Sequence, residues 1–417
     1  MASRILILGA GPAGITAAER LRELESTTGP RLDISMVSAE PFPPYAPPAM
    51  ADHFMHGGEH RLFWKGRDIV DRLGLSYHAG ARIDRVDTRR RRVVLDDDSV
   101  LDYTQLIIAT GSRLYAPLRG YQLPGVYNFK SLSAARDLIA HARTGKVQRA
   151  LVVGAGFIGV EVALLLADLG VGVLMLEKKD RVMPRMLDRE SAAIVLEAMV
   201  RRGIDVETGV EAAAFCGRRK VTRMRLENGD HVKADAYVAA TGVKPNIEFL
   251  EGSGIETDWG VIVDDALATN VPGVWAAGDV AETRDRVTRR RYVHAIWPNA
   301  VAQGRVVAER LLGFDTVYAG AESMNSLRHL DVPLIAVGAR DGEDTLRVAR
   351  DGWLRKIFVE DGKIVGFRLA GNISGAGFYR SLMLRGVDIR RFGPDLAEPG
   401  FGLGQLAMVA PEVAVRT

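Results

Sequence analysis

The sequence predicts an α/β fold in which one strand–glycine turn–helix–strand unit occurs twice and a smaller α+β region follows. Three observations support this prediction. The run GAGPAG at residues 9–14 directly follows the apolar strand Arg4–Leu8, and GAGFIG at 154–159 follows Ala150–Val153. After each run, apolar residues recur at helical spacing, and a second apolar strand then ends in a glutamate. Beyond residue 320, short strands alternate with turns before a helix that is expected from about Ala376.

The composition is that of an ordinary globular protein, with 417 residues of which 47% are hydrophobic and 26% charged. This length allows two or three domains. The net charge of +3 is too small to indicate nucleic-acid binding. Cys216 is the only cysteine, which excludes an intramolecular disulfide, a cysteine-ligated iron–sulfur cluster and a cysteine-based zinc site. We therefore expect no metal site on this chain.

The chain has no sequence pattern of export or membrane insertion. Arg4 leads straight into a strand, without the charged and then apolar segments of a secretory signal. The most apolar region, Ala150–Leu176, contains Glu161, Asp168 and several glycines, so it fails as a membrane span. We expect a cytoplasmic protein without a membrane span.

The three glycines of each turn have different expected roles. The first permits the tight turn, the second lets the backbone approach a pyrophosphate, and the third lets helix and strand pack closely, while the helix N-terminus attracts the phosphates. In this order they are Gly9, Gly11 and Gly14 in the first turn and Gly154, Gly156 and Gly159 in the second. The acid that ends the second strand is expected to bind the ribose hydroxyls, and it is Glu40 or Glu177. Two complete copies of this pattern predict two bound dinucleotides.

The second unit favours NAD over NADP. A carboxylate at Glu177 hydrogen-bonds a free 2′-hydroxyl and repels a 2′-phosphate. Lys178, Lys179 and Arg181 follow directly and could soften that repulsion. The residues of the first unit do not by themselves say which dinucleotide it binds.

Three further segments complete an ordered set of motifs. Residues 106–111 read LIIATG, 237–242 read YVAATG and 274–279 read VWAAGD. Together with the two glycine turns, this order resembles the FAD-dependent pyridine nucleotide–disulfide oxidoreductase superfamily over about residues 1–320. Within that superfamily the chain is similar to ferredoxin and rubredoxin reductases and to the flavin domain of NADH-dependent nitrite reductases. It is also similar to the flavoprotein subunits of NAD-linked 2-oxoacid oxidoreductases of the phenylglyoxylate dehydrogenase type.

The resemblance implies FAD on the first unit and NAD(H) on the second. It implies that Asp279 hydrogen-bonds the ribityl–pyrophosphate region of FAD and that Glu40 binds the adenosine ribose. Glu161 matches the family position beside the nicotinamide, with a solvent-facing helix acid as the alternative interpretation. Trp297, in the segment HAIWPNAVAQG, would lie near the isoalloxazine ring, and the helix after it would point its N-terminus at the flavin pyrimidine. The alternative for Trp297 is an ordinary core aromatic residue.

The predicted binding residues form two sets. For FAD they are Gly9, Gly11, Ala13, Gly14, Glu40, Ala109, Thr110, Gly111, Gly278, Asp279 and Trp297. For NAD they are Gly154, Gly156, Ile158, Gly159, Glu161, Glu177 and Gly242. No protein residue is predicted to be catalytic, because the flavin carries the chemistry.

The resemblance also implies a division into three domains. Residues 1–112 and 244–320 would form a discontinuous FAD-binding domain, interrupted by an NAD-binding domain at 113–243. Residues 321–417 would form a C-terminal α+β interface domain that ends in a glycine- and proline-rich tail. That tail is expected either to lie on a partner or to fray.

The chain lacks the cysteine that passes electrons onward in many members of this superfamily. The first helix contains none, and in the loop PPYAPPAMADHF the family's cysteine position is best matched by Pro48. Thiol–disulfide exchange requires a thiolate, so disulfide and peroxide chemistry by those routes is excluded. The flavin is therefore the only redox centre that we expect on the chain, and the electrons must be exchanged with something outside it.

These features predict an electron-transfer flavoprotein that moves electrons between NAD(H) and an iron–sulfur protein, by hydride transfer at flavin N5. Such a protein would be a subunit of a larger complex, which we favour, or a stand-alone ferredoxin or rubredoxin reductase, and it could be a homo-oligomer. An NADH oxidase that uses oxygen or a quinone is the alternative function, and a sensor or scaffold is a third. The basic clusters Arg89–Arg92 and Arg289–Arg291 are typical of solvated hairpins or loops, with a docking patch for an acidic partner as the other interpretation.

Overall fold

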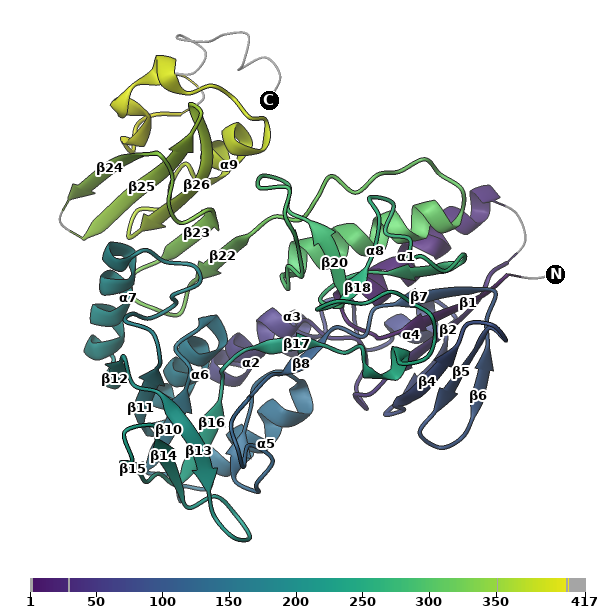
Figure 1. Ribbon diagram of the computed structural model, residues 1–417, viewed down its shortest axis with the longest axis horizontal. Coiled ribbons are helices and arrows are strands. Elements are labelled where there is room, and N and C mark those ends of the chain that lie inside the picture. Colours follow the sequence, from purple (N-terminus) through teal and green to yellow (C-terminus); the bar gives the residue numbers. More distant parts are fainter. Residues whose placement is uncertain (1–2, 29–30, 351, 403, 405–417) are drawn as a thin grey trace. The chain divides into compact units, whose positions relative to one another are not determined.

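The computed structural model describes residues 3–28, 31–350, 352–402 and 404, in two compact units (Figure 1). The first unit comprises Met1–Tyr115, Lys130–Arg136 and Val243–Ala321. The second comprises Ala116–Phe129, Asp137–Gly242 and Glu322–Thr417. The predicted division into three domains stays a prediction, and part of the predicted tail, residue 403 and residues 405–417, lies outside the described residues.

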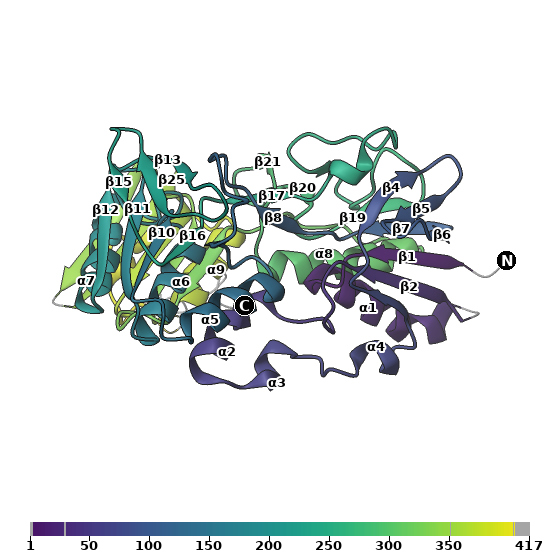
Figure 2. The same cartoon turned by 90° about the horizontal axis from the view of Figure 1, so that it is seen from below.

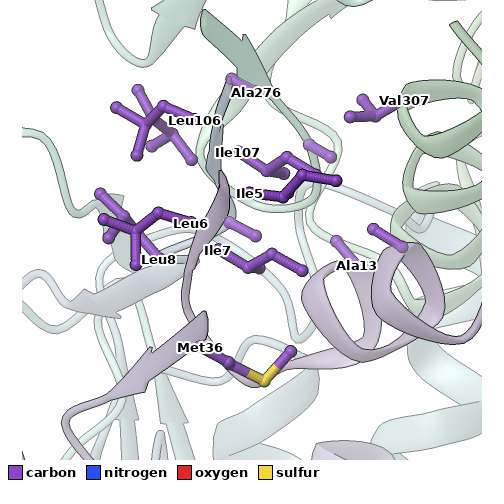
Figure 3. Close-up of a cluster of buried hydrophobic side chains, with 14 of the residues drawn as sticks. Ile5, Leu6, Ile7, Leu8, Ala13, Met36, Leu106, Ile107, Ala276 and Val307 are labelled. Carbon is purple, nitrogen blue, oxygen red and sulfur yellow. The ribbon is translucent and has the colours of Figure 1, made fainter. Parts of the chain in front are cut away.

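The first unit is built on a five-stranded parallel sheet in the order β19-β7-β1-β2-β3. Its strands are β1 (Arg4–Leu8), β2 (Asp33–Ser38), β3 (Ser76–Ala79), β7 (Gln105–Ile108) and β19 (Val274–Ala276). Strand β1 is central, and its consecutive apolar residues are buried on both faces, as is usual for parallel sheets. Figure 3 shows Ile5, Leu6, Ile7 and Leu8 packed between residues of the neighbouring strands and helices.

Two helices lie side by side along one face of this sheet (Figure 2). They are α1 (Pro12–Thr28) and α8 (Trp297–Leu311). Their close approach depends on Gly304, because a Cβ atom there would lie 2.4 Å from the carbonyl oxygen of Ala13. The start of α1 is therefore held against the middle of α8.

The rest of the first unit consists of short strands, most of them in antiparallel pairs, and of short helices. Its further strands are β4 (Ile83–Asp87), β5 (Arg92–Leu95), β6 (Val100–Asp102), β8 (Ser112–Leu114), β17 (Val243–Pro245), β18 (Val261–Ile262), β20 (Ala281–Arg284) and β21 (Arg291–Tyr292). Its further helices are η1 (Pro47–Ala49), α2 (Met50–His56), α3 (Glu59–Leu62), α4 (Ile69–Arg72) and η2 (Glu248–Leu250). Both predicted basic clusters lie at hairpins, one between β4 and β5 and one between β20 and β21.

The second unit contains another five-stranded parallel sheet, in the order β12-β11-β10-β16-β9. Its strands are β9 (Val126–Tyr127), β10 (Arg149–Val153), β11 (Gly172–Glu177), β12 (Ile204–Thr208) and β16 (Ala236–Ala239). Its helices are α6 (Phe157–Asp168) and α7 (Arg189–Arg201), and α5 (Leu132–Ala142) begins in the first unit and ends in the second. A three-stranded antiparallel sheet follows, made of β13 (Ala212–Cys216), β14 (Arg223–Leu226) and β15 (His231–Val232).

The C-terminal part of the second unit is an antiparallel sheet in the order β22-β23-β26-β25-β24. Its elements are β22 (Met324–Leu327), β23 (Leu334–Gly338), β24 (Asp344–Arg350), β25 (Trp353–Glu360), β26 (Lys363–Ala370), α9 (Ala376–Leu384), η3 (Arg390–Phe392) and η4 (Pro394–Ala397). Lys356 on β25 binds both Asp188, at 2.8 Å, and Glu190, at 3.0 Å, and Arg368 Nε donates to the carbonyl of Met186 at 2.6 Å. These contacts join this sheet to the start of α7.

The predicted fold class is therefore confirmed: two parallel-sheet units, each with a glycine turn, and an α+β region at the end. In the part of the chain that the structure describes, no helix combines the length and the apolar character needed to cross a membrane. Within the same residues, no group of three or more His, Cys, Asp or Glu side chains is placed to hold a metal ion.

Candidate dinucleotide-binding sites

The first glycine turn connects β1 to α1, and its three glycines meet different surroundings. Gly9 has a φ of +113°, and a Cβ atom there would lie 2.1 Å from the oxygen of Ala109. A Cβ on Gly14 would lie 1.9 Å from the oxygen of Gly9. A Cβ on Gly11 would have nothing within 4 Å. The outer two glycines are thus required by the fold itself, whereas Gly11 borders open space at the start of α1.

The second glycine turn, between β10 and α6, repeats this geometry. Gly154 has a φ of +106°, and a Cβ there would lie 2.5 Å from the oxygen of Ala240. A Cβ on Gly159 would lie 2.0 Å from the oxygen of Gly154, and one on Gly156 would have nothing within 4 Å. Gly156 is also the N-cap of α6 and supplies no side-chain cap, so the first N–H groups of the helix face this open space. Both turns therefore fit a dinucleotide whose pyrophosphate lies over the second glycine.

Glu40 lies two residues beyond the end of β2, and its carboxylate contacts the start of another helix. Its Oε2 accepts hydrogen bonds from the Ser133 backbone N–H, at 3.0 Å, and from the Tyr45 hydroxyl, at 3.4 Å. The Tyr45 hydroxyl in turn accepts one from the Leu132 N–H at 3.0 Å. Burial, with the Glu40 charge adding to it, raises the pKa of Tyr45 far above its usual range. Glu40 and Tyr45 thus fix the start of α5, a contact that the sequence did not indicate.

Glu177 ends β11, and it is 9% exposed. Its Oε2 accepts from the N–H of Ala155 in the glycine turn, and its Oε1 accepts from the N–H of Lys179, both at 2.9 Å. The side chain therefore ties the turn to the end of the neighbouring strand. Each carboxylate oxygen can accept a second hydrogen bond, so the predicted contact with the ribose remains chemically compatible.

Asp279 follows β19, and its carboxylate contacts two side chains that were not among the predicted site residues. Its Oδ2 accepts from Ser112 Oγ at 2.9 Å and binds Lys130 Nζ at 3.2 Å. Next to it, Gly278 N–H donates to Gln303 Oε1 on α8 at 2.6 Å. Ser112 directly follows the LIIATG segment, and Gln303 lies within the HAIWPNAVAQG segment, so both had a usable signal, whereas nothing in the sequence pointed to Lys130.

The ATG segment after β7 is also held by a distant residue. Thr110 Oγ1 donates to the Asn246 carbonyl at 3.0 Å, and Asn246 Nδ2 donates back to the Thr110 carbonyl at 2.8 Å. The Asn246 N–H donates to the Gly111 carbonyl at 3.0 Å. A Cβ on Gly111 would have nothing within 4 Å, and the same is true of Gly242 in the second unit. Both ATG segments therefore end beside open space.

Trp297 is the first residue of α8 and is partly buried. Its ring lies edge-on to that of Trp64, with ring centroids 4.7 Å apart and an interplanar angle of 71°. The N-cap residue Ile296 provides no side-chain cap, and Pro298 follows. The start of α8 thus retains N–H groups that no side chain caps, as the predicted contact with the flavin pyrimidine requires. Sequence reasoning did not identify Trp64.

Glu161 lies in the first turns of α6 and is mostly covered. Its side chain is 15% exposed, so it is not a solvent-facing helix acid. Burial raises its pKa to about 7. His329, between β22 and β23, places its Nδ1 3.9 Å from Glu161 Oε1. This pair joins the glycine-turn helix to the C-terminal part of the same unit.

Each predicted set of residues lies within a single unit. All eleven residues predicted for FAD belong to the first unit, and all seven predicted for NAD belong to the second. Ala13 lies against both Gly278 and Gly304, whose Cβ positions would contact it, and Ile158 lies in the first turn of α6. The binding roles of these residues stay predictions.

The profile of the pyridine nucleotide-disulphide oxidoreductase family matches residues 3–304. The NADH-dependent phenylglyoxylate dehydrogenase subunit epsilon of Aromatoleum evansii is 29% identical over 399 residues, which cover 93% of each chain. The assimilatory nitrate reductase electron transfer subunit of Bacillus subtilis is 27% identical over 95% of this chain, and this chain spans about half of it, 51%. Among solved structures, the ferredoxin reductase for the CYP199A2 system from Rhodopseudomonas palustris has a TM-score of 0.86 at 25% identity, covering 97% of this chain and all of that one.

Proposed function

Because the chain belongs to the pyridine nucleotide-disulphide oxidoreductase family, and is thus an FAD-containing oxidoreductase that uses NAD(H), we propose that it exchanges electrons between NAD(H) and a separate iron–sulfur protein. One observation carries this proposal: the chain offers no thiol for the second half-reaction. Pro48 occupies the position of the family's cysteine, and Cys216, the sole cysteine, lies on β13 in the other unit.

The relatives support a partner protein as the electron acceptor or donor. The relative from Aromatoleum evansii is by name a subunit of an NADH-dependent dehydrogenase, and it matches this chain over nearly its full length. The structural neighbour from Rhodopseudomonas palustris is a ferredoxin reductase. We infer that this chain works as a cytoplasmic flavoprotein subunit of an NAD-linked 2-oxoacid oxidoreductase complex, with a stand-alone ferredoxin reductase as the second candidate.

In this proposal residues 1–112 and 244–320 bind FAD and residues 113–243 bind NAD(H). Gly11 and Gly156 receive the pyrophosphates, and Glu40 and Glu177 bind the adenosine riboses. The open space at both second glycines and the absence of a side-chain cap at Gly156, the N-cap of α6, support these assignments. The C-terminal residues 321–417 form the interface domain.

The reaction balances with two one-electron partners. One NADH and two oxidised iron–sulfur proteins give one NAD⁺, one proton and two reduced iron–sulfur proteins. When bound, the flavin supplies the conversion between a two-electron hydride and single electrons. The protein's part is to hold and orient: Asp279 is fixed by Ser112 and Lys130, and Trp297 by Trp64, so that both present one geometry to the cofactor.

The test is anaerobic reduction of the purified flavin-containing protein by NADH, followed by addition of either an oxidised ferredoxin or oxygen. We expect NADH to bleach the flavin absorbance and the ferredoxin to be reduced much faster than oxygen. Rapid NADH turnover with oxygen alone would instead establish an NADH oxidase. A flavin that NADH does not bleach would reject every redox function and leave a sensor or scaffold.

A further inference from the structure

The hairpin formed by β20 and β21, residues 281–292, carries an unusual density of positive charge and is called the arginine hairpin below. Residues 284–291 read RDRVTRRR. Its arginines are Arg284, Arg286, Arg289, Arg290 and Arg291, and all except Arg286 are exposed. The adjoining Tyr292 is 52% exposed. Arginine and tyrosine are among the residue types that are enriched in protein interfaces.

The turn of the arginine hairpin has a defined conformation. Asp285 is 8% exposed, and it accepts hydrogen bonds from the N–H groups of Val287, at 2.9 Å, and Thr288, at 2.7 Å. His294 Nε2 lies 3.1 Å from the other carboxylate oxygen. Burial alone would raise the pKa of Asp285, but these hydrogen bonds lower it below its usual value. Glu282, the other acid of the hairpin, is 7% exposed. Both acids are therefore buried, and neither neutralises the arginines at the surface of the hairpin.

The charge at the tip of the hairpin is not balanced by neighbouring acids. Arg291 donates to the Val263 carbonyl at 2.6 Å, and Arg284 lies 3.8 Å from Asp265. Arg289 and Arg290 form no side-chain ion pair with any described residue. Two adjacent, exposed and uncompensated guanidinium groups on a fixed turn form a recognition surface for carboxylates.

The other basic cluster, in the β4–β5 hairpin, differs in this respect. Arg90 pairs with Asp87 at 3.1 Å, and Arg92 pairs with Asp102 at 2.8 Å. The neighbouring β5–β6 turn adds three aspartates at residues 96–98. This hairpin is therefore close to charge balance, and it offers a matched control on the same unit.

The arginine hairpin is continuous with the segment predicted to cover the flavin. Its second strand runs directly into residues 293–296 and then into α8, which begins with Trp297 (Figure 2). The contact between His294 and Asp285 fixes the hairpin to this segment. A partner bound to the hairpin would therefore be held on the segment that leads to Trp297.

We propose that the arginine hairpin is the docking surface for an acidic iron–sulfur protein, an inference that rests on the proposed function and locates its partner. Opposite charges steer such an encounter, and they accelerate association by about 10–1000-fold at low ionic strength. A fixed turn that displays Arg289 and Arg290 also selects for partner carboxylates at a matching spacing, which a flexible basic tail would not do.

The test compares two charge reversals of equal size in the flavin-containing protein. The variant R289E/R290E changes the hairpin, and R89E/R90E changes the control cluster. The probe is a purified acidic [2Fe–2S] ferredoxin, and the measurements are its Kd and its reduction rate by NADH at several salt concentrations. NADH turnover with a neutral quinone, which needs no docking, reports the flavin and NAD sites separately.

We expect R289E/R290E to raise the ferredoxin Kd at least about tenfold at low salt and to remove most of the salt dependence, with quinone turnover unchanged. The control variant should change the Kd less than about threefold.

Three outcomes would overturn the proposal. The first is equal weakening by both variants, which would indicate an effect of net charge alone. The second is an unchanged ferredoxin Kd in R289E/R290E. The third is binding to phosphatidylserine vesicles that R289E/R290E abolishes while ferredoxin binding persists, which would make the hairpin a membrane-surface site. A wild-type protein that reduces the quinone but neither binds nor reduces the ferredoxin would reject the proposed function itself.

Discussion

The two glycine turns have the same backbone but different side chains around them. Gly9 and Gly154 adopt φ values of +113° and +106°, and Cβ atoms on Gly14 and Gly159 would approach a backbone oxygen to 1.9 and 2.0 Å. The motif therefore produces one local structure twice. It does so because its steric requirements involve only backbone atoms within the turn and the adjacent strand.

The glutamate at or just beyond the end of the second strand makes different contacts in the two units. Glu40 is partly buried and contacts the start of α5, whereas Glu177 is buried and holds the glycine turn itself. Two residues after the third glycine, the first unit has the buried, neutral Thr16, and the second unit has Glu161. The motif therefore specifies the same backbone in both units, while the charge around the turn is set separately in each unit.

The largest effect is expected from a methyl group at the third glycines. Gly14→Ala and Gly159→Ala would each place Cβ against a backbone oxygen, a clash that costs at least about 3 kcal/mol. We expect Gly14→Ala to abolish flavin retention, and Gly159→Ala to retain flavin but lose NADH binding, as measured by flavin absorbance and NADH titration. If the melting temperature and the NADH affinity of Gly159→Ala equal those of the wild type, the expected clash between its Cβ and the Gly154 oxygen is contradicted.

The next effect concerns Glu161, whose pKa burial raises from 4.5 to about 7. Its unfolded form ionises at lower pH than its folded form, so stability is lost as pH rises from about 4.5 through about 7, by up to about 3 kcal/mol. Urea denaturation at pH 5 and pH 8 should show a smaller pH dependence in Glu161→Gln than in the wild type. Glu197→Gln, at an exposed position on α7, is the matched control and should behave as the wild type does. An identical pH dependence in Glu161→Gln and the wild type would contradict the raised pKa.

Replacing Glu177 or Glu40 with alanine should have different effects on NADH binding, because the two residues lie in different units. Glu177→Ala leaves the N–H groups of Ala155 and Lys179 without their acceptor and removes the predicted ribose contact, so we expect NADH binding to weaken by about 1–3 kcal/mol. Glu40→Ala should loosen the start of α5 and leave the NADH Kd unchanged. Isothermal titration with NADH checks both variants. An unchanged Kd in Glu177→Ala would remove Glu177 from the NAD site.

The smallest effect on stability is expected at the second glycines. A Cβ on Gly11 or Gly156 meets no protein atom within 4 Å, so the melting temperature of either alanine variant without cofactor should equal that of the wild type. Each variant should nevertheless bind its own dinucleotide about tenfold more weakly, a change of about 1.4 kcal/mol, because the methyl group occupies the space proposed for the pyrophosphate. A fall in FAD affinity in Gly156→Ala, with NADH affinity intact, would reverse the assignment of the two units.

The sequence by itself determined the α/β class, the two glycine turns and the absence of a second thiol. These features follow from short-range rules: apolar periodicity specifies strands and helices, and glycine is required where a Cβ would lie within about 3 Å of a backbone atom or where φ is positive. The position of α9, expected from about Ala376, was likewise confirmed. Each of these depended on residues close together in the chain.

Only the tertiary structure decided which distant side chains surround each candidate site. Lys130 reaches Asp279, Trp64 meets Trp297, and His329 lies beside Glu161. The two residues of each pair are far apart in the sequence, so no local periodicity predicts their contact. The chain topology brings them together, because parallel strands and the helices between them return far-separated segments to the same edge of a sheet. The motif therefore predicts the place of the cofactor, and the long-range packing determines the charge, burial and shape that the cofactor would meet.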